Sequence, residues 1–139
     1  MRRLSDIVLN QNPLMLRGSV NVSEACRQMF ETRVGSVLVV DEQNRLEGIF
    51  TGRDAVQRVI AAGRNSTSTL LSDVMTENPV AMQTNNSAIE ALNLMWDGGF
   101  RHVPVLENGK VIGVVSRGDF KSDEEMRLEE ERELWEHMR

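Results

Sequence analysis

Two short stretches of the chain repeat the same set of side chains. Residues 46–55 read LEGIFTGRDA and residues 111–120 read VIGVVSRGDF, so each holds a Gly, two apolar residues, a Thr or Ser, two spacers and an Asp. A carboxylate can accept two hydrogen bonds from the neighbouring hydroxyls of a ribose. A hydroxyl at the start of a helix, next to free backbone amides, suits a phosphate oxygen. The spacing therefore favours sugar recognition by Asp54 and Asp119.

Phosphate would then be bound by the hydroxyls and by nearby positively charged side chains. Thr51 and Ser116 precede the two Asp residues by three positions. The nearby basic residues are Arg53, Arg117, Lys121 and Arg101. Gly52 and Gly118 would let backbone come close to a ligand. The copies differ because an Arg directly precedes the first Asp and a Gly the second, so the sequence predicts two unequal sites.

The same residues have a purely structural interpretation. In a capping box, a Thr or Ser and an acid three residues later satisfy the orphan amides of a helix start, worth about 1 kcal/mol. Thr51 with Asp54 and Ser116 with Asp119 fit that pattern too. Duplication copies caps as faithfully as ligand sites, so repetition alone does not decide between the two interpretations.

The repetition extends well beyond this motif. LSDIV at residues 4–8 matches LSDVM at residues 71–75. Glu24-Ala25 and Met29 match Glu90-Ala91 and Met95, and the spacing between copies drifts from 67 to 65 residues. Such drift indicates short loop insertions between equivalent elements. The predicted organisation is repeat 1 over 1–62, a polar linker over 63–70, repeat 2 over 71–121 and a charged helix over 122–139.

Each repeat begins with a predicted amphipathic helix. SEACRQMFETRVG and NSAIEALNLMWDGG have apolar residues at helical spacing, and Ser23 and Ser87 lie near the starts, where a hydroxyl can cap. Gly35 and Gly98-Gly99 are the expected stops. The residues predicted to share the buried faces are Cys26, Met29 and Phe30 in the first helix, and Ala88, Leu92, Met95 and Trp96 in the second.

Strand-like segments follow each helix. SVLVVD and LEGIFT lie on either side of a turn at residues 41–45, and HVPVLE and VIGVVS on either side of Asn108-Gly109, a strong two-residue hairpin signal. A second helical segment follows each motif. The pattern predicts an α+β fold of two β-α-β-β-α repeats.

The ordered, doubled pattern resembles a pair of CBS domains, the cystathionine beta-synthase type repeat, forming a Bateman module. SDVMTENPV, RHVPVLENGKVIGVVS and the closing Gly-apolar-apolar-Thr/Ser-x-x-Asp carry the resemblance, which covers residues 4 to 121. It implies repeats packed sheet against sheet about a pseudo-twofold axis. It also implies regulatory binding of AMP, ADP, ATP, NAD or S-adenosylmethionine, with an adenine slot along Gly35-Ser36-Val37 and His102-Val103-Pro104. A homodimer is expected, and no required cofactor.

Composition excludes several other classes. The net charge of −5 leaves no basic footprint for nucleic acid. No apolar run reaches the roughly 18 residues that span a bilayer, and with the single Cys26 this favours a cytoplasmic protein. His102 is expected as a strand or ligand-wall residue rather than a catalytic base, since no nucleophile has recognisable context. Cys26, His102 and His137 show no metal-ligand spacing.

The tail from Lys121 carries eight acidic and four basic residues and is strongly helix-prone. Leu128, Trp135 and Met138 share one face, and Arg127 can pair with Glu131. This helix either packs on its own domain or covers a partner or dimer surface. We therefore predict a non-enzymatic adenine-nucleotide sensor acting by conformational change. The alternatives are an interaction module with empty clefts, whose tail recruits a protein target, and a small nucleotide-processing enzyme.

Overall fold

The structure is a computed structural model that describes residues 1–137. The chain divides into two units, each built around one sequence repeat. The first-repeat unit consists of Asn12–Val80 together with Asn108–Val111. The second-repeat unit consists of Met1–Gln11, Ala81–Glu107 and the chain from Ile112 onward. The units therefore do not coincide with the two sequence repeats, because residues 1–11 belong with the second repeat.

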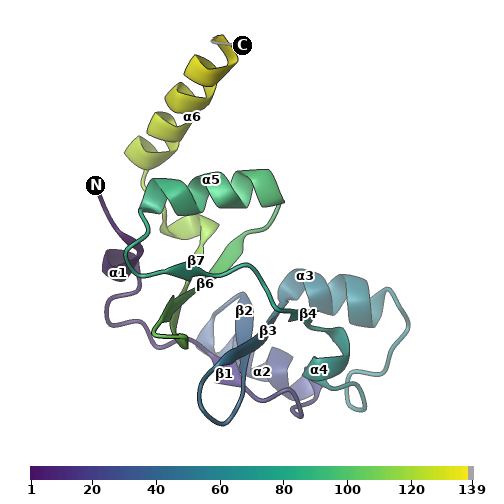
Figure 1. Cartoon of the computed structure of the whole chain (residues 1–139). Helices are drawn as coiled ribbons and strands as arrows, with labels where there is room; N and C mark the ends of the chain where they lie inside the picture. The colour runs from purple at the N-terminus through teal and green to yellow at the C-terminus, as the bar shows by residue number, and fades with distance from the viewer. Residues whose placement is uncertain (138–139) are drawn as a thin grey trace. The chain divides into compact units, whose positions relative to one another are not determined.

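The first-repeat unit contains a four-stranded sheet in the order β1-β2-β3-β4 (Figure 1). Its elements are β1 (Met15–Leu16), α2 (Val22–Thr32), β2 (Ser36–Val40), β3 (Leu46–Thr51), α3 (Gly52–Asp54), the π-helix η1 (Ala55–Ile60), α4 (Leu71–Val74) and β4 (Thr76–Glu77). Strand β1 is parallel to β2, and β2, β3 and β4 are antiparallel neighbours. All five residues of β2 are buried, which agrees with its apolar run VLVV after Ser36.

The second-repeat unit has a three-stranded sheet in the order β5-β6-β7. Its elements are α1 (Leu4–Ile7), β5 (Met82–Gln83), α5 (Ala88–Gly98), β6 (His102–Glu107), β7 (Lys110–Ser116), the 3-10 turn η2 (Arg117–Asp119) and α6 (Ser122–His137). Residues 15–60 run through the predicted β-α-β-β-α order, and residues 82–137 repeat it with a 3-10 turn before α6, so the last helix of the second repeat and the C-terminal helix are one element. The α+β prediction is confirmed.

The units exchange their first helices. Helix α1 opens the first repeat, yet Leu4 is fully buried in the second-repeat core with Met95 and Val103. Helix α4 opens the second repeat, yet Leu71 and Val74 are buried in the first-repeat core. Gln11 completes the exchange, since its side-chain amide bonds both the carbonyl (2.9 Å) and the amide (2.6 Å) of Val114 in β7. Each unit therefore contains most of one repeat and the first helix of the other.

A glycine in each motif makes room for the exchanged segment. A Cβ on Gly113 would lie 2.7 Å from both Val8 Cβ and Gln11 Oε1. A Cβ on Gly48 would lie 2.9 Å from the Thr76 carbonyl oxygen and from Met75 Cγ. Real Cβ atoms do not come this close to their neighbours. The glycine that opens both motifs is thus a packing requirement, because the first residues of the other repeat press against it.

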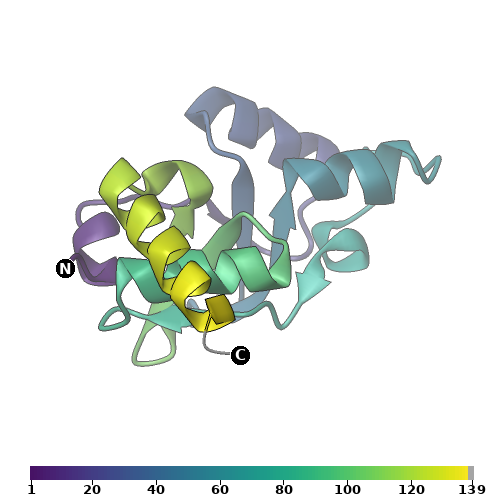
Figure 2. The same ribbon diagram turned by 90° about the horizontal axis from the view of Figure 1, so that it is seen from above.

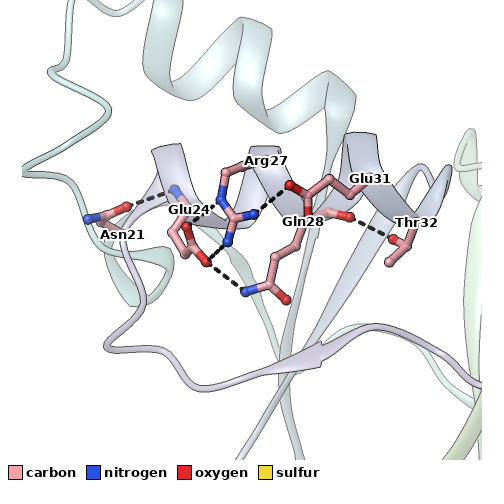
Figure 3. A network of polar contacts seen from close by, with 6 residues as sticks. All are labelled: Asn21, Glu24, Arg27, Gln28, Glu31 and Thr32. Atoms are coloured by element: carbon pink, nitrogen blue, oxygen red, sulfur yellow. Dashed lines mark hydrogen bonds and ion pairs between the residues drawn. The ribbon is translucent and has the colours of Figure 1, made fainter.

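Helix α2 begins at Asn21, whose side-chain oxygen accepts from the Glu24 amide at 2.8 Å (Figure 3). Its outer face carries a polar network in which Arg27 bonds Glu24 and also Glu31, the latter at 2.6 Å. These side chains are exposed and screened by water, so the pairs add little to stability. The predicted cap at Ser23 is wrong, because Ser23 is already the second residue of the helix.

The first-repeat helix buries a narrower stripe than predicted. Val22, Ala25 and Met29 are buried, whereas Phe30 is 84% exposed. One residue turns the helix by about 100°, which carries Phe30 off the stripe that Met29 occupies. The predicted stop at Gly35 is also displaced, because α2 already ends at Arg33, which adopts the left-handed conformation (φ 57°).

Helix α5 matches its prediction more closely. Ser87 caps its start by accepting from the Glu90 amide, and Gly99 ends it in the left-handed conformation (φ 69°). Ala88, Leu92 and Met95 are buried as predicted. Trp96 is 56% exposed, so its assignment to the buried face is wrong.

Both predicted turns are present. Asn108 and Gly109 have φ of 52° and 78° between β6 and β7, as a type I′ hairpin requires. Between β2 and β3 the Asp41 amide donates to the Arg45 carbonyl, and Asn44 has φ of 62°. Asn and Gly tolerate positive φ, which is why sequence located these turns correctly.

Helix α6 crosses over α5 in the two views of the structure (Figures 1 and 2). Leu128 is buried against Ile89 and Leu92, and the predicted Arg127–Glu131 pair forms at 3.3 Å. Trp135, predicted on the same face as Leu128, is 69% exposed, and Met138 lies outside the described residues.

Within residues 1–137 no helix is long and apolar enough to cross a membrane.

Candidate functional site

The first-repeat motif lies where two strands end together. Ser36 at the start of β2 pairs with Thr51 at the end of β3, and the Gly52 amide donates to the Gly35 carbonyl at 3.2 Å. The antiparallel register thus brings the predicted adenine segment beside the predicted ribose and phosphate residues. We call the group Gly35, Ser36, Val37, Thr51, Arg53 and Asp54 site one.

Asp54 closes the start of α3 with one of its two oxygens. Its Oδ2 accepts from the Thr51 amide at 2.9 Å and from the Thr51 hydroxyl at 3.1 Å. Thr51 Oγ1 accepts in turn from the Asp54 amide at 3.3 Å. Asp54 is 9% exposed. The capping interpretation therefore holds for Oδ2, and only Oδ1 remains for another donor.

The second-repeat motif repeats the two bonds to the Asp carboxylate but not the bond from the Asp amide to the hydroxyl. Asp119 Oδ2 accepts from the Ser116 amide at 2.7 Å and from the Ser116 hydroxyl at 3.1 Å. The Arg117 amide donates to the Arg101 carbonyl at 3.0 Å, as Gly52 does to Gly35. We call the group Arg101, His102, Val103, Pro104, Ser116, Arg117 and Asp119 site two.

The amides next to each cap are mostly engaged by the protein itself. Thr51, Gly52 and Asp54 donate to Asp54, Gly35 and Thr51 respectively. This leaves fewer free amides for a phosphate than the sequence argument assumed. A phosphate would therefore depend more on side-chain charge than on the helix start.

The predicted adenine segments differ in what they can offer. Val37 and Val103 are fully buried and Pro104 is buried, so their side chains belong to the core and present no exposed surface to a ligand. Ser36 is also buried, whereas His102 at the matched position is half-buried. Burial, and to a lesser extent the positive charge of Arg101, lowers the pKa of His102. Asp119 raises this pKa, but by less, so the net shift is downward. His102 is therefore a neutral imidazole at physiological pH.

The predicted phosphate ligands are arranged unequally. Arg53 and Arg101 are exposed. The Arg117 guanidinium lies over the Trp96 ring, 4.8 Å from its centroid, and Arg132 of α6 lies 6.0 Å from the same centroid. Arg132 is held in turn by Asp97 at 2.8 Å. Arg117 thus already has a partner that a ligand would have to replace.

Two arginines that sequence reasoning missed hold the motifs in place. Arg58 lies four residues after Asp54, with its Nε 3.5 Å from Asp54 Oδ1. Arg2 donates to the Asp119 carbonyl at 2.8 Å and pairs with Glu124 at 2.6 Å. The i, i+4 spacing could have indicated Arg58. No local pattern could have indicated Arg2, which is 117 residues from Asp119 in sequence.

The ion pair of Arg2 and Glu124 is the strongest electrostatic feature beside site two. The hydrogen bond from Arg2 is the main cause that lowers the pKa of Glu124, and Glu124 raises the pKa of Arg2. Glu124 also accepts from the Lys121 amide at 2.9 Å. The pair therefore ties residues 1–11 to the turn that carries Asp119.

A cavity of about 230 Å³ lies beside this ion pair. Its lining consists of Met1, Arg2, Ile89, Lys121, Asp123, Glu124 and Arg127. Lys121, a phosphate candidate, faces this cavity, but no residue of site one or site two does. The volume is below the roughly 300 Å³ typical of small-molecule sites. We therefore place the candidate nucleotide sites at the two motifs and not at this cavity.

Over residues 1–137, no three His, Cys, Asp or Glu side chains are grouped as metal ligands.

Comparison with known proteins defines the class. The CBS domain family model matches residues 4–61 and again residues 71–122. The chain therefore belongs to the CBS domain family and is a CBS pair. It is 45% identical over 102 residues to a CBS domain-containing protein of Arabidopsis thaliana, CBSCBSPB2, covering 73% of this chain and 19% of that protein. The chain thus spans about a fifth of the length of that relative.

Solved structures with the same fold include two of particular interest. A CBS domain protein of Pyrobaculum aerophilum complexed with AMP has a TM-score of 0.80 at 22% identity, over 91% of this chain and 97% of that one. A hexameric CBS-CP12 protein from bloom-forming cyanobacteria has a TM-score of 0.79 at 27% identity, over 88% of this chain and 72% of that one.

Proposed function

We propose that this CBS pair is a regulatory module that binds adenine nucleotide, with Asp54 and Asp119 as the ribose acceptors. The observation that carries the proposal is the twice-built cap, which engages Oδ2 of each Asp and leaves Oδ1 for another donor. The AMP complex of the Pyrobaculum protein supports the ligand class. The ligand would be AMP, ADP, ATP, NAD or S-adenosylmethionine.

The remaining site residues have supporting roles in this proposal. Backbone of Gly35-Ser36-Val37 and of Val103-Pro104 would border the adenine, with His102 as a neutral wall in site two. Thr51, Ser116 and the nearby arginines would meet phosphate. Binding would shift the equilibrium between two states of the module, which requires different affinities for the two. No step of this proposal needs a nucleophile or a general base.

Calorimetry with each adenosine compound tests the proposal. Asp119→Ala should abolish binding at site two, and Asp54→Ala at site one. Both changes also remove a cap, which costs about 1 kcal/mol of stability. Asp6 and Asp73 supply matched controls, because each bonds the backbone amide three residues earlier, at 2.9 and 3.0 Å, outside the two sites. Asp6→Ala and Asp73→Ala should cost similar stability and leave binding intact.

Two results would contradict the proposal. One is the absence of binding heat with every compound at protein concentrations above about 100 micromolar, the range of roughly −5.5 kcal/mol. The other is unchanged binding in the double variant Asp54→Ala with Asp119→Ala. A thermal-shift series offers an independent reading, because a ligand of the folded form raises stability with its concentration.

A second candidate function rests on the end of α6. Leu134 and Trp135 are 61% and 69% exposed on a strongly acidic helix. In this alternative the sites stay empty and α6 recruits a partner. Trp135→Ala would then abolish function in the cell, while Asp54→Ala and Asp119→Ala would leave it unchanged.

Homodimer formation is a further part of the proposal, and sedimentation velocity checks it. The hexameric cyanobacterial relative supports assembly beyond a monomer.

A further inference from the structure

Arg58 is held at the edge of site one by one ion-pair contact and two hydrogen bonds to carbonyls. Its Nε lies 3.5 Å from Asp54 Oδ1. Its terminal nitrogen Nη1 also lies 3.4 Å from the Val74 carbonyl and 3.2 Å from the Met75 carbonyl, at the C-terminal end of α4. Carbonyls at a helix end carry partial negative charge and attract a cation. The guanidinium is therefore placed by the fold and is not a freely moving surface charge.

This placement occupies the one carboxylate oxygen that the cap leaves over. Asp54 Oδ2 is engaged by the Thr51 amide and hydroxyl, and Oδ1 faces Arg58. A ribose diol that approaches Asp54 must therefore share Oδ1 with a guanidinium or displace it. The Arg58 side chain is 49% exposed, so its contact with Asp54 is partly screened by water and can be broken.

The second repeat has the opposite charge at the matched position. Asp123 lies four residues after Asp119, as Arg58 does after Asp54. The helix after Asp54 continues from α3 into η1, whereas the turn after Asp119 ends at Phe120 before α6 begins. Among the described residues of the second-repeat unit, no side chain donates a hydrogen bond to Asp119 Oδ1. Among the described residues, the Asp54 carboxylate forms an ion pair and the Asp119 carboxylate forms none, because Arg2 bonds the Asp119 backbone carbonyl instead.

We propose that Arg58 determines the ligand selectivity of site one, by competing with the ribose for Asp54 and turning to phosphate once displaced. This inference rests on the proposed function above. A nucleoside without phosphate binds site one weakly, because it must displace the guanidinium from Asp54 and supplies no other anion for the guanidinium to bind. A nucleotide supplies phosphate oxygens, with which a guanidinium forms bidentate, charge-assisted bonds. Site one therefore selects phosphorylated adenosine, and site two does so less.

The test measures selectivity at one site at a time. In an Asp119→Ala protein, which isolates site one, dissociation constants for adenosine, AMP and ATP are measured by calorimetry with Arg58 and with Arg58→Gln. The Gln variant should bind adenosine about two- to fivefold more tightly, the range expected for losing an exposed ion pair. It should bind AMP and ATP no more tightly than before. The ratio of the adenosine constant to the AMP constant should therefore fall.

A matched control and a second variant keep the test sharp. Asp123→Asn in an Asp54→Ala protein changes the charge at the equivalent position of repeat 2 and should leave adenosine-to-AMP selectivity at site two unchanged. Arg58→Lys keeps the charge but loses the bidentate fork, so it should give an intermediate ratio. Thermal unfolding shows whether Arg58→Lys and Arg58→Gln are folded. If Arg58→Gln does not fold, the selectivity of Arg58→Lys alone is compared with that of the protein that keeps Arg58.

The outcomes separate this inference from the proposed function. Nucleotide binding at site one with an unchanged adenosine-to-AMP ratio in both Arg58 variants overturns the inference and leaves the function standing. Failure of site one to bind any compound, with or without Arg58, also overturns it, and binding at site two still supports the function. If the unaltered protein binds none of the compounds, both fall together.

Discussion

Site one and site two share an Asp-closed turn and have different surroundings. In both, an Asp caps the turn through Oδ2, and the residue after the Thr or Ser donates its amide across the sheet. Site one is then held by Arg58 of its own helix, and site two by Arg2 from residues 1–11. The difference teaches that the motif defines the turn, whereas residues outside the motif decide which of its atoms remain for a ligand.

The motif glycines should give the largest difference in stability. Gly113→Ala should cost about 2 kcal/mol, because the new Cβ meets the branched Cβ of Val8, which cannot turn away. Gly48→Ala should cost less, about 1 kcal/mol, because part of its crowding comes from the flexible Met75 side chain. Urea unfolding of both variants measures the two costs. Equal costs would show that the exchanged segments press equally on the two sheets.

The ion pair beside site two should come next in size. Glu124→Gln should lower the free energy of unfolding by about 1 kcal/mol, since it weakens the charge-assisted bonds that a mostly buried carboxylate accepts from Arg2. Arg127→Ala breaks an exposed pair on the same helix and should change stability by less than about 0.5 kcal/mol. Urea unfolding distinguishes the two. A cost for Arg127→Ala that matched Glu124→Gln would contradict the special role given to Arg2.

A smaller effect is expected from pH near neutrality, where His102 of the second-repeat unit titrates. Burial lowers the pKa of His102 below its usual 6.5, so the unfolded chain takes up the proton more readily than the folded one. Stability is therefore full above pH 6.5 and falls as the pH drops through the lowered pKa. His102→Gln should remove this fall. Ser36 holds the matched position in repeat 1 and cannot titrate in this range.

A second loss of stability should follow at lower pH. The pKa of Glu124 is also lowered, in this case by its bond to Arg2, so its contribution is complete above its usual 4.5 and is lost as the carboxylate is protonated. Thermal unfolding from pH 7.5 to 4 measures both steps. Persistence of the upper step in His102→Gln would assign it to another group.

The smallest expected effect is spectroscopic. In a Trp135→Phe protein, which leaves Trp96 as the single tryptophan, Arg117→Ala should shift fluorescence emission to longer wavelength. The reason is that the ring loses the guanidinium that covers one face. Arg53→Ala removes an arginine from the corresponding motif of site one, which belongs to the other unit, and should leave the emission of Trp96 unchanged. An identical spectrum in both variants would show that Arg117 does not cover Trp96 in solution.

Sequence predicted what local chemistry determines. The Asn108-Gly109 hairpin, the cap at Ser87 and the Gly99 stop follow from residues that tolerate or require a particular backbone conformation. The Thr51–Asp54 box was predicted as one of two interpretations, and the structure contains the cap. The ribose role stays a prediction.

Other features depend on contacts that no local pattern records. Met29 and Phe30 look equally apolar, and only packing decides that Phe30 is exposed. Arg33 ends α2 in a conformation that is uncommon for a residue with a side chain, which a search for glycine misses. The bond from Arg2 to the Asp119 carbonyl joins residues far apart in sequence, so no periodicity reveals it.

The exchanged helix α1 has a consequence for the order in which the protein can be assembled. Leu4 and Val8 complete a core whose remaining buried members, among them Met95 and Val115, are synthesised only after more than half of the chain. Until then α1 has no native surface to cover, and a helix of four residues does not persist in water. Contacts between such distant segments slow folding. The second-repeat unit should therefore be the later of the two to close during synthesis.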